Sequence, residues 1–309
     1  MPRVENKTGD LLLSLDNYNI RRALRTLECC LSQGSWFQTT EIKRSSFEID
    51  GRTISVKISR PIVLRAIGYG PRNIYYETEN IPPIVNVMKN GYDPTTDLLG
   101  LLMVKWFYKH IDTQDAFKIS NQQRIGDFIN DVRTIFPLIF PETKDFIADV
   151  ISHFIAARIL GKDTRDVSWD EETMLTLMPK GIALWEELAD NSVLLELFRD
   201  DIWLEKDRHD VSPTRALPRE KRFMECIGIC QSIALMEQHF HRSLFNISIK
   251  RRYINSFGDN TIAYHLSRGI LGSIRREIDP HRPALIDNAY KTLSALISNT
   301  EEDLHRVHS

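Results

Sequence analysis

Long apolar runs are missing from this sequence of 309 residues. No window approaches the roughly 18 uninterrupted apolar residues that a membrane-spanning helix requires. The first residues, Met1-Pro2-Arg3-Val4, also lack the apolar core of a secretory signal peptide. These two absences predict a protein that does not enter a membrane and that works in the cytoplasm.

Cysteine is scarce as well, because the chain contains only 4 of them. A chain of this length with so few cysteines lacks a disulfide framework and fits a reducing compartment. Cys226 and Cys230 stand four residues apart in an apolar helical pattern, where free cysteine behaves as a small hydrophobic residue. We therefore expect both thiols in the core and not in a metal or redox site.

Catalytic and metal-binding patterns are also missing. The sequence contains no Gly-x-x-x-x-Gly-Lys-Ser/Thr loop for nucleotide phosphates. His239 and His241 are two residues apart, so that on a helix they point to different faces and do not share a metal. His209 and Asp210 beside Ser212 lie in a charged segment that offers no packed setting for a triad. We expect a chain that is not an enzyme and holds neither a cofactor nor a metal.

Helical periodicity dominates what is present, so the predicted fold class is mainly α. Asp50-Gly51 between two alternating runs predicts one small β-hairpin. Mixed charge with Pro213 and Pro218 marks residues 200–218 as a linker. Beyond it, residues 219–309 are expected to form an antiparallel helical bundle. Its predicted helices span 219–245, 261–278 and 282–304.

The middle of the chain, residues 93–199, has the pattern of a winged helix-turn-helix. Apolar residues at helical spacing alternate with prolines and polar turns, and a short apolar strand follows an acidic loop. Such modules bind DNA or dock proteins. The predicted elements are helices at 95–110, 122–134 and 142–160 and a strand at 174–177.

Charge in this module argues against a duplex as its main partner. The predicted recognition helix offers Lys144 and Arg158 against Glu142, Asp145 and Asp149, and the acidic loop adds more carboxylates. Affinity for nucleic acid depends largely on neutralising phosphates with Lys and Arg. The balance favours a protein partner, while DNA contact stays the alternative.

The stretch Tyr18-Asn19-Ile20-Arg21-Arg22-Ala23-Leu24 predicts the start of a helix reaching about residue 33, with an arginine on its first turn. It resembles the sensor 2 helix of AAA+ ATPases of the origin-recognition and related bacterial P-loop NTPase groups, whose pattern is roughly Gly-(Asp/Asn)-x-Arg-x-Ala-Leu. In that family the helix belongs to a lid, and the resemblance implies that Arg21 reaches the phosphates of a nucleotide. Tyr18 stands where the family has glycine. Arginine is also a good helix former, so a solvated Arg21 is the alternative.

The resemblance covers residues 15–190 and implies a lid-like helical segment with a hairpin at 1–92, followed by the winged helix. The chain is then the lid plus winged-helix part of a P-loop NTPase without the nucleotide-binding core. We expect a non-catalytic regulatory or protein-interaction region that docks an NTPase, in the same polypeptide or in another chain, or a downstream partner, and that can form oligomers. The alternative is a nucleic-acid-binding module that works through the winged helix and a basic C-terminal patch.

The basic C-terminal patch is a local feature of a chain whose net charge is −2. The run Lys250-Arg251-Arg252 is expected to close a loop between two helices, with Tyr253 interleaved as in an oligonucleotide platform. The same charge is also typical of a surface that binds an acidic protein partner or is simply solvated. The candidate residues are Lys250, Arg251, Arg252, Tyr253, Arg268, Arg275 and Arg276.

Overall fold

A computed structural model describes most of the chain. The described residues are 3–4, 6–24, 27, 48–50, 53–55, 57–58, 60–69, 87–88, 94–111, 121–137, 143–162, 168–198, 219–243, 247–277 and 283–305. The predicted linker at 200–218 lies outside this set, as does the predicted helix beyond residue 24, apart from residue 27.

The described part is mainly helical, as predicted. Its helices are α1 (Asn6–Leu15), α4 (Arg60–Tyr69), α6 (Pro94–Lys109), α7 (Ile125–Ile135), α8 (Thr143–Ala156), α9 (Pro179–Asp190), α10 (Val193–Phe198), α11 (Arg219–Ser243), α12 (Ile247–Phe257), α13 (Ile262–Glu277) and α14 (Pro283–His305), with a short stretch at 20–24 that we call helix 20–24. The strands are β1 (Arg3–Val4), β2 (Glu48–Asp50), β3 (Thr53–Ser55), β4 (Lys57–Ile58), β5 (Gln123–Arg124), β6 (Leu160–Gly161) and β7 (Met174–Leu177). Within these residues, none of the helices combines the length and the apolar character needed to cross a bilayer.

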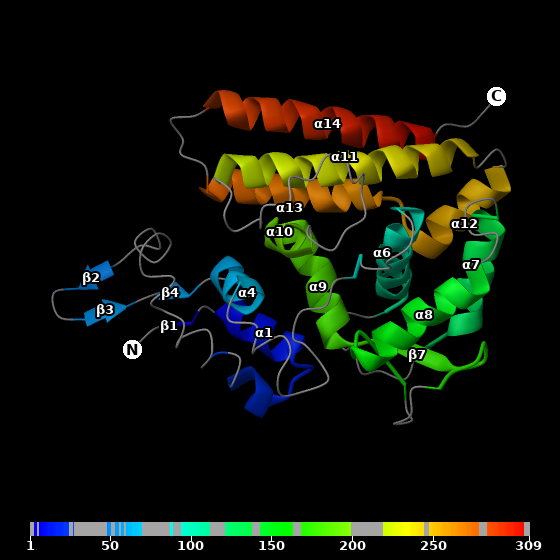
Figure 1. Cartoon of the computed structure of the whole chain (residues 1–309), viewed down its shortest axis with the longest axis horizontal. Helices are drawn as coiled ribbons and strands as arrows, with labels where there is room; N and C mark the ends of the chain where they lie inside the picture. Colours follow the sequence, from blue (N-terminus) through cyan, green and yellow to red (C-terminus); the bar gives the residue numbers. More distant parts are fainter. Residues whose placement is uncertain are drawn as a thin grey trace.

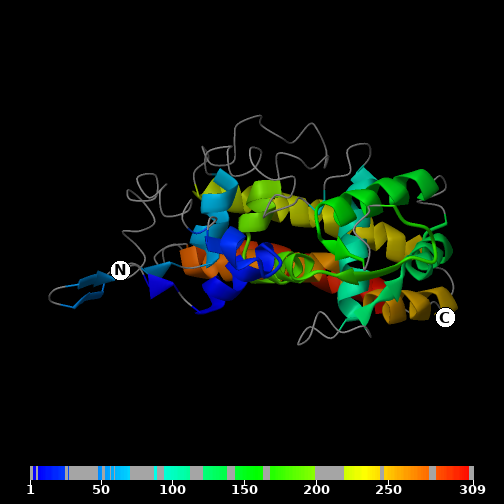
Figure 2. The same cartoon turned by 90° about the horizontal axis from the view of Figure 1, so that it is seen from below.

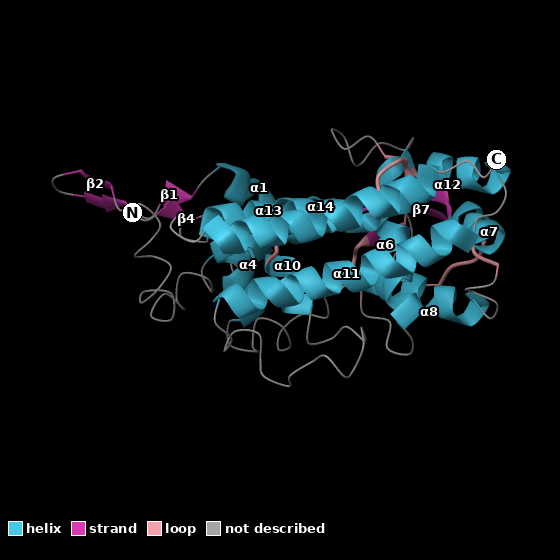
Figure 3. Cartoon of the chain, turned by 90° about the horizontal axis from the view of Figure 1, so that it is seen from above, coloured by secondary structure: helices cyan, strands magenta, loops and turns pink. Residues whose placement is uncertain are grey.

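Three long helices, α11, α13 and α14, lie side by side along one edge of the molecule (Figures 1 and 3). They confirm the three helices predicted for the C-terminal part. The carboxylate of Glu237 on α11 accepts hydrogen bonds from the backbone N–H groups of Ile262 (2.7 Å) and Ala263 (2.8 Å), at the first turn of α13. A buried carboxylate is stabilised at a helix N-terminus, so this contact fixes the register of the two helices.

The loop predicted at Lys250-Arg251-Arg252 is wrong, because these residues lie inside α12. The run looked polar enough for a loop, but its residues lie on different sides of an amphipathic helix, with Lys250 buried and Arg251 exposed. Tyr253, Ser256 and Phe257 form part of its buried side.

The middle of the chain combines α6, α7 and α8 with a small antiparallel sheet of strand order β5-β7-β6. Gln123 pairs with Leu175, and Leu160 pairs with Leu177. The strand predicted at 174–177 is confirmed. The helix predicted over 122–134 begins only at Ile125, after β5, and the one predicted over 142–160 ends at Ala156, because the chain turns there into β6.

The N-terminal part contains α1, α4 and two pairs of strands. The predicted hairpin is confirmed, since β2 and β3 pair antiparallel with Ile49 opposite Ile54. β1 pairs with β4 in parallel. The β2–β3 hairpin extends away from the rest of the molecule, as two perpendicular views agree (Figures 1 and 2).

Helix α9 joins these parts, because it packs against α1, α6 and α13 (Figure 1). Pro179 occupies its first turn, where the missing N–H of proline costs nothing. Arg60 of α4 reaches two acids on this helix, Glu187 at 2.5 Å and Asp190 at 2.8 Å. Buried apolar residues from Leu11 to Leu293 belong to one continuous core, to which α9 contributes Leu184, Trp185 and Leu188.

Candidate functional site

The loop between α1 and helix 20–24 makes an unusually tight turn. The N–H of Tyr18 donates to the carbonyl of Leu13 (2.6 Å), and the N–H of Asn17 donates to that of Ser14 (2.9 Å). This pair of bonds is the Schellman pattern that ends many helices. Asn17 has φ 50° and Tyr18 has φ 59°. Asparagine adopts this left-handed conformation readily, whereas an aromatic residue does so at a cost in backbone energy.

Helix 20–24 begins directly after this turn, with Asn19 as its N-cap. The side-chain oxygen of Asn19 accepts a hydrogen bond from the backbone N–H of Arg22 (3.2 Å), and its carbonyl accepts one from Ala23 (2.9 Å). This geometry satisfies N–H groups that a helix start leaves open. Arg21 therefore lies on the first turn and is exposed, which confirms the predicted helix start. Among the described residues, no side chain forms an ion pair or hydrogen bond with Arg21.

The turn is held against two other elements by the side chain of Asn17. Its Oδ1 accepts a hydrogen bond from the backbone N–H of Lys180 on α9 (3.0 Å), and its Nδ2 donates to the carbonyl of Arg158 after α8 (3.2 Å). Arg158 has φ 57°, so the positive-φ residues other than glycine in the described chain all meet here. Such backbone strain concentrates at functional sites. We call this set the arginine junction: Asp16, Asn17, Tyr18, Arg21, Arg22, Arg158 and Lys180.

Positive charge exceeds negative charge in the arginine junction. Lys180 is buried, with 1% of its surface exposed, and its Nζ donates to the carbonyl of Ala157 at 3.2 Å. Burial, together with the positive charges of Arg22 and Arg158, lowers the pKa of Lys180 to about 7, while Asp16 opposes this shift. Asp16 also pairs with Arg22, with 3.5 Å between Oδ1 and Nε. Asp16 therefore interacts with both Arg22 and Lys180.

Replacing Lys180 with methionine is expected to reduce the increase in the free energy of unfolding that occurs as the pH rises above 7. The pKa of Lys180 is about 7 in the folded chain, against about 10.4 for an unfolded lysine. Between these values the unfolded state binds more protons, so the free energy of unfolding rises with pH and falls again as the pH returns to 7. We expect roughly 2 kcal/mol of this rise between about pH 7 and pH 9 in the unmodified protein.

Urea unfolding of the protein and of Lys180→Met at both pH values measures this effect. Between these two pH values, the free energy of unfolding of the variant should rise by roughly 2 kcal/mol less than that of the unmodified protein. An equal rise in both proteins would show that the amine is not buried as described.

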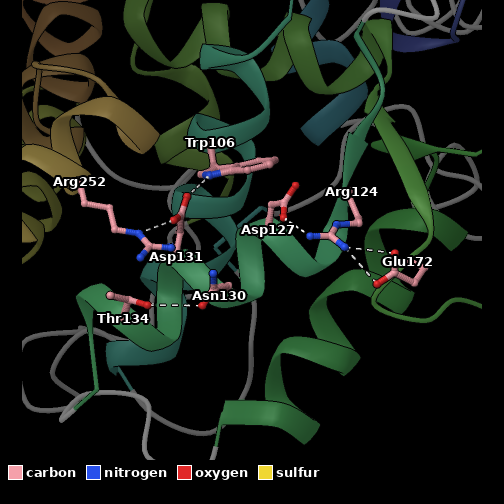
Figure 4. A network of polar contacts seen from close by, with 8 residues as sticks. All are labelled: Trp106, Arg124, Asp127, Asn130, Asp131, Thr134, Glu172 and Arg252. Atoms are coloured by element: carbon pink, nitrogen blue, oxygen red, sulfur yellow. Dashed lines mark hydrogen bonds and ion pairs between the residues drawn. The ribbon is translucent and has the colours of Figure 1, made fainter.

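The predicted basic patch on α12 is divided between the surface and the interior. Lys250 and Tyr253 are buried, so the expectation that they belong to an exposed platform needs correction. Tyr253 stacks on Phe257, with ring centroids 5.2 Å apart, and is not open to a base. The Nε of Arg252 donates to Asp131 Oδ1 of α7 at 2.8 Å (Figure 4). Arg251 is the exposed member of this run.

The remaining predicted members of the patch lie on α13, where all three are exposed. Arg276 donates to the backbone carbonyl of Asp190 (2.6 Å), and the guanidinium of Arg275 lies 5.7 Å from the ring centroid of Tyr290. Arg268 is exposed without such a contact among the described residues. The patch is therefore spread over two helices, and several of its members serve intramolecular contacts.

Arginines around the three-stranded sheet are paired with acids of the same region. Arg124 donates to Asp127 (2.7 Å) and to Glu172 (3.1 Å), as Figure 4 shows. Arg133 lies 3.6 Å from Glu171. Asp131 receives the indole N–H of Trp106 in addition to Arg252. These pairings partly neutralise Arg124, Arg133 and Arg252, which are then less able to attract a duplex.

The predicted buried cysteines are confirmed, because Cys226 and Cys230 both lie in the core. Burial raises the pKa of Cys230 to about 12, and its thiol donates to the carbonyl of Ala263 (3.5 Å). In the described ranges, no three residues of metal-binding type come together. His241 is buried, whereas the side chain of His239 lies outside the described set.

The sequence predicted that Arg21 lies on the first turn of a helix, but it did not indicate that Asn17, Arg158 and Lys180 lie together. Asn17 contacts residues 141 and 163 positions away in the chain, and no local pattern encodes such contacts. Arg158 lies inside the helix that the sequence predicted over 142–160, although the structure ends α8 at Ala156. Comparisons of the chain with protein-family models, with curated proteins and with solved structures found no significant match.

Proposed function

We propose that the chain is a non-catalytic regulatory and protein-interaction region related to the C-terminal half of bacterial P-loop NTPases. In this proposal Arg21 contacts a phosphate of a nucleotide that a P-loop domain holds, in the same polypeptide or in another chain. The observation that carries the proposal is the Asn19-capped first turn of helix 20–24, which exposes Arg21. The proposal includes a location in the cytoplasm, where such NTPases find their nucleotides.

The conformation of Tyr18 supports the likeness to a sensor 2 helix. The family pattern has glycine at this position, and glycine is favoured where φ is positive. Tyr18 has φ 59°, so the chain follows the path that a glycine allows, although the side chain is large. A tyrosine held in this conformation is consistent with a turn kept for the placement of the arginine that follows.

The order of elements in the middle of the chain supports a winged helix-turn-helix. Helices α6, α7 and α8 come with β5 before α7, β6 after α8 and β7 after a long loop, and β7 lies between the other two strands. This order is consistent with a winged module in which α8 takes the place of the recognition helix. Because arginines of this module pair with its own acids, we propose that it docks a protein rather than DNA.

Affinity purification of the tagged chain from its own cells tests the proposed function. We expect a protein with a P-loop to be recovered, and to be retained more strongly with a non-hydrolysable ATP analogue than with ADP. Arg21→Ala should reduce this nucleotide-dependent retention by about tenfold, the effect of losing a charged hydrogen bond. Arg251→Ala is the matched control, because Arg251 is also an exposed helical arginine.

Cross-linking with mass spectrometry should place the recovered protein near Lys7, an exposed residue of α1. Two results would contradict the proposal. One is retention that does not differ between the ATP analogue and ADP. The second is an equal loss in the Arg21 and Arg251 variants.

A further inference from the structure

Helix α13 carries a row of arginines along its exposed side. Arg268 and Arg275 are seven residues apart, which is two turns of helix, so that they lie on the same face and about 10 Å apart. The guanidinium of Arg275 lies 5.7 Å from the ring centroid of Tyr290, which brings the neighbouring helix α14 into the same surface. We call this surface the α13–α14 face: Arg268, Arg275, Arg276, Tyr290 and Lys291.

Positive charge on the α13–α14 face is not balanced by acids of the same helices. The described side chains of α13 and α14 include the four exposed cations of the face and one exposed acid, Asp287. In the described part of the chain, none of the three arginines has an ion pair with a carboxylate. Asp190, whose backbone carbonyl accepts from Arg276 at 2.6 Å, gives its carboxylate to Arg60 at 2.8 Å. The guanidinium groups of the face are thus left to anions of another molecule.

Stabilisation of α13 itself accounts for only some of these arginines. Arg275 and Arg276 lie in the last turn, where positive charge favours the C-terminal end of a helix. That effect falls off within the last turn, and Arg268 lies about two turns earlier. Among the described residues, Arg268 has no partner in a hydrogen bond, ion pair or ring contact. The side chain of Arg268 is therefore free to bind a partner.

We propose that the α13–α14 face binds an acidic amphipathic helix of a partner protein, with two carboxylates seven residues apart facing Arg268 and Arg275. Arginine and carboxylate form paired, charge-assisted hydrogen bonds. A helix laid along α13 repeats its side chains at the same spacing of about 10 Å, whereas one side of an extended strand offers them about 7 or 13 Å apart. Leu271, half-buried between the two arginines, and Tyr290, which is 46% exposed, offer apolar contacts to the same helix.

Nucleic acid fits this face less well than an acidic helix does. Affinity for nucleic acid rises with the number of phosphates that are neutralised, and the face offers four cations beside Asp287, on a chain whose net charge is −2. The neighbouring basic run on α12 does not extend the surface, because Lys250 is buried and Arg252 is bound to Asp131. The inference goes beyond the proposed function, since it involves neither Arg21 nor a nucleotide.

Fluorescence anisotropy on the full chain at low salt tests the face, with labelled peptides of about 20 residues as probes, a length at which Ala-rich sequences form helices. The test peptide carries two Glu residues seven apart with Leu between them. The control peptide has the same composition with the Glu residues five apart, so that they lie on different faces of the helix. We expect the test peptide to bind about fivefold tighter or more, because only it can pair with both arginines at once.

Variants of the protein show whether these arginines make the contact. Arg268→Glu and Arg275→Glu should each weaken binding of the test peptide about tenfold, because an attraction becomes a repulsion. Arg251→Glu is the matched control and should stay within about twofold, since Arg251 is an exposed helical arginine of α12. A peptide with one Glu replaced by Lys should bind the Arg268→Glu variant better than the test peptide does. A variant that had merely misfolded would not show this reversal.

Three results would overturn the proposal: equal binding of the test and control peptides, an equal loss in the Arg251 variant, or absence of the reversal. If a DNA duplex or single strand binds through Arg268 while the test peptide does not, the face serves nucleic acid instead. Arg21→Ala should leave peptide binding unchanged. Because no nucleotide enters these measurements, the α13–α14 face and the proposed function can each fail while the other stands.

Discussion

Replacing Gly269 with alanine is expected to lower the free energy of unfolding by about 3 kcal/mol. Gly269 lies where α13 crosses the C-terminal end of α9. A Cβ at this position would sit 2.2 Å from the carbonyl oxygen of Leu188 and 2.9 Å from that of Asn191. Both are backbone atoms, so that the two helices must separate to admit a methyl group. The loss should exceed that of an ordinary surface change, since α9 joins the N-terminal, sheet-containing and bundle parts.

Gly228→Ala is the matched control for this prediction. Gly228 is also a helical glycine, on α11, but a Cβ there would meet no atom within 4 Å. Alanine is the better helix former by about 0.5–1 kcal/mol, so this variant should be slightly more stable than the unmodified protein. Urea unfolding of both variants measures the difference. If Gly269→Ala is as stable as Gly228→Ala, the close crossing of α9 and α13 is incorrect.

Most helices could be predicted from the sequence because their apolar residues repeat at helical spacing. In α7 the residues Ile125, Phe128, Ile129 and Val132 are all buried, and this face was the basis of the prediction. The Asp-Gly turn gave the hairpin for an equally local reason. Strands of two residues such as β5 and β6 are too short to show any alternation. The early end of α8 was missed because Arg158, and not glycine, adopts the left-handed turn.

Helix α12 shows a different limit of sequence reasoning. Lys250, Arg251 and Arg252 read as a solvated loop, yet Lys250 is buried and Arg252 is bound to α7. Long basic side chains bury their methylene stems on a helix while the charged groups find partners elsewhere. Those partners, such as Asp131, are distant in sequence, so no local pattern could show which basic residues are open and which are engaged.

In the candidate site, too, some residues could be predicted from the local sequence and others depend on tertiary packing. The position of Arg21 on a first turn follows from residues that are neighbours in the chain, and the sequence could supply it. The contributions of Asn17, Arg158 and Lys180 depend on the packing of α1 against α9, which is a property of the fold. A motif thus located one arginine, whereas the tertiary structure brought Asn17, Arg158 and Lys180 together.

Replacing Glu196 with glutamine is expected to lower the free energy of unfolding by about 3–5 kcal/mol, because it removes a buried negative charge that faces Arg65 and Arg222. Glu196 on α10 is 1% exposed. Its Oε1 lies 3.4 Å from Arg65 of α4 and accepts a hydrogen bond from Ser192 at 2.9 Å, while its Oε2 lies 3.5 Å from Arg222 of α11. Glutamine keeps the shape and can still accept from Ser192, so the variant isolates the loss of charge.

Glu172→Gln provides the comparison, since Glu172 also pairs with an arginine, at 3.1 Å, but its side chain is 75% exposed. Water and salt screen such a surface pair, and its loss should cost no more than about 1 kcal/mol. Urea unfolding gives both free energies, and hydrogen exchange should report the Glu196 loss first in α4, which Arg65 joins to α10. Equal costs for the two variants would mean that the carboxylate of Glu196 is solvated, and the buried junction of α4, α10 and α11 would then be incorrect. A larger loss of free energy of unfolding in the Glu196 variant, with early exchange of the amide hydrogens of α4, is the expected result. It would show that the buried charge of Glu196 holds α4 against α10.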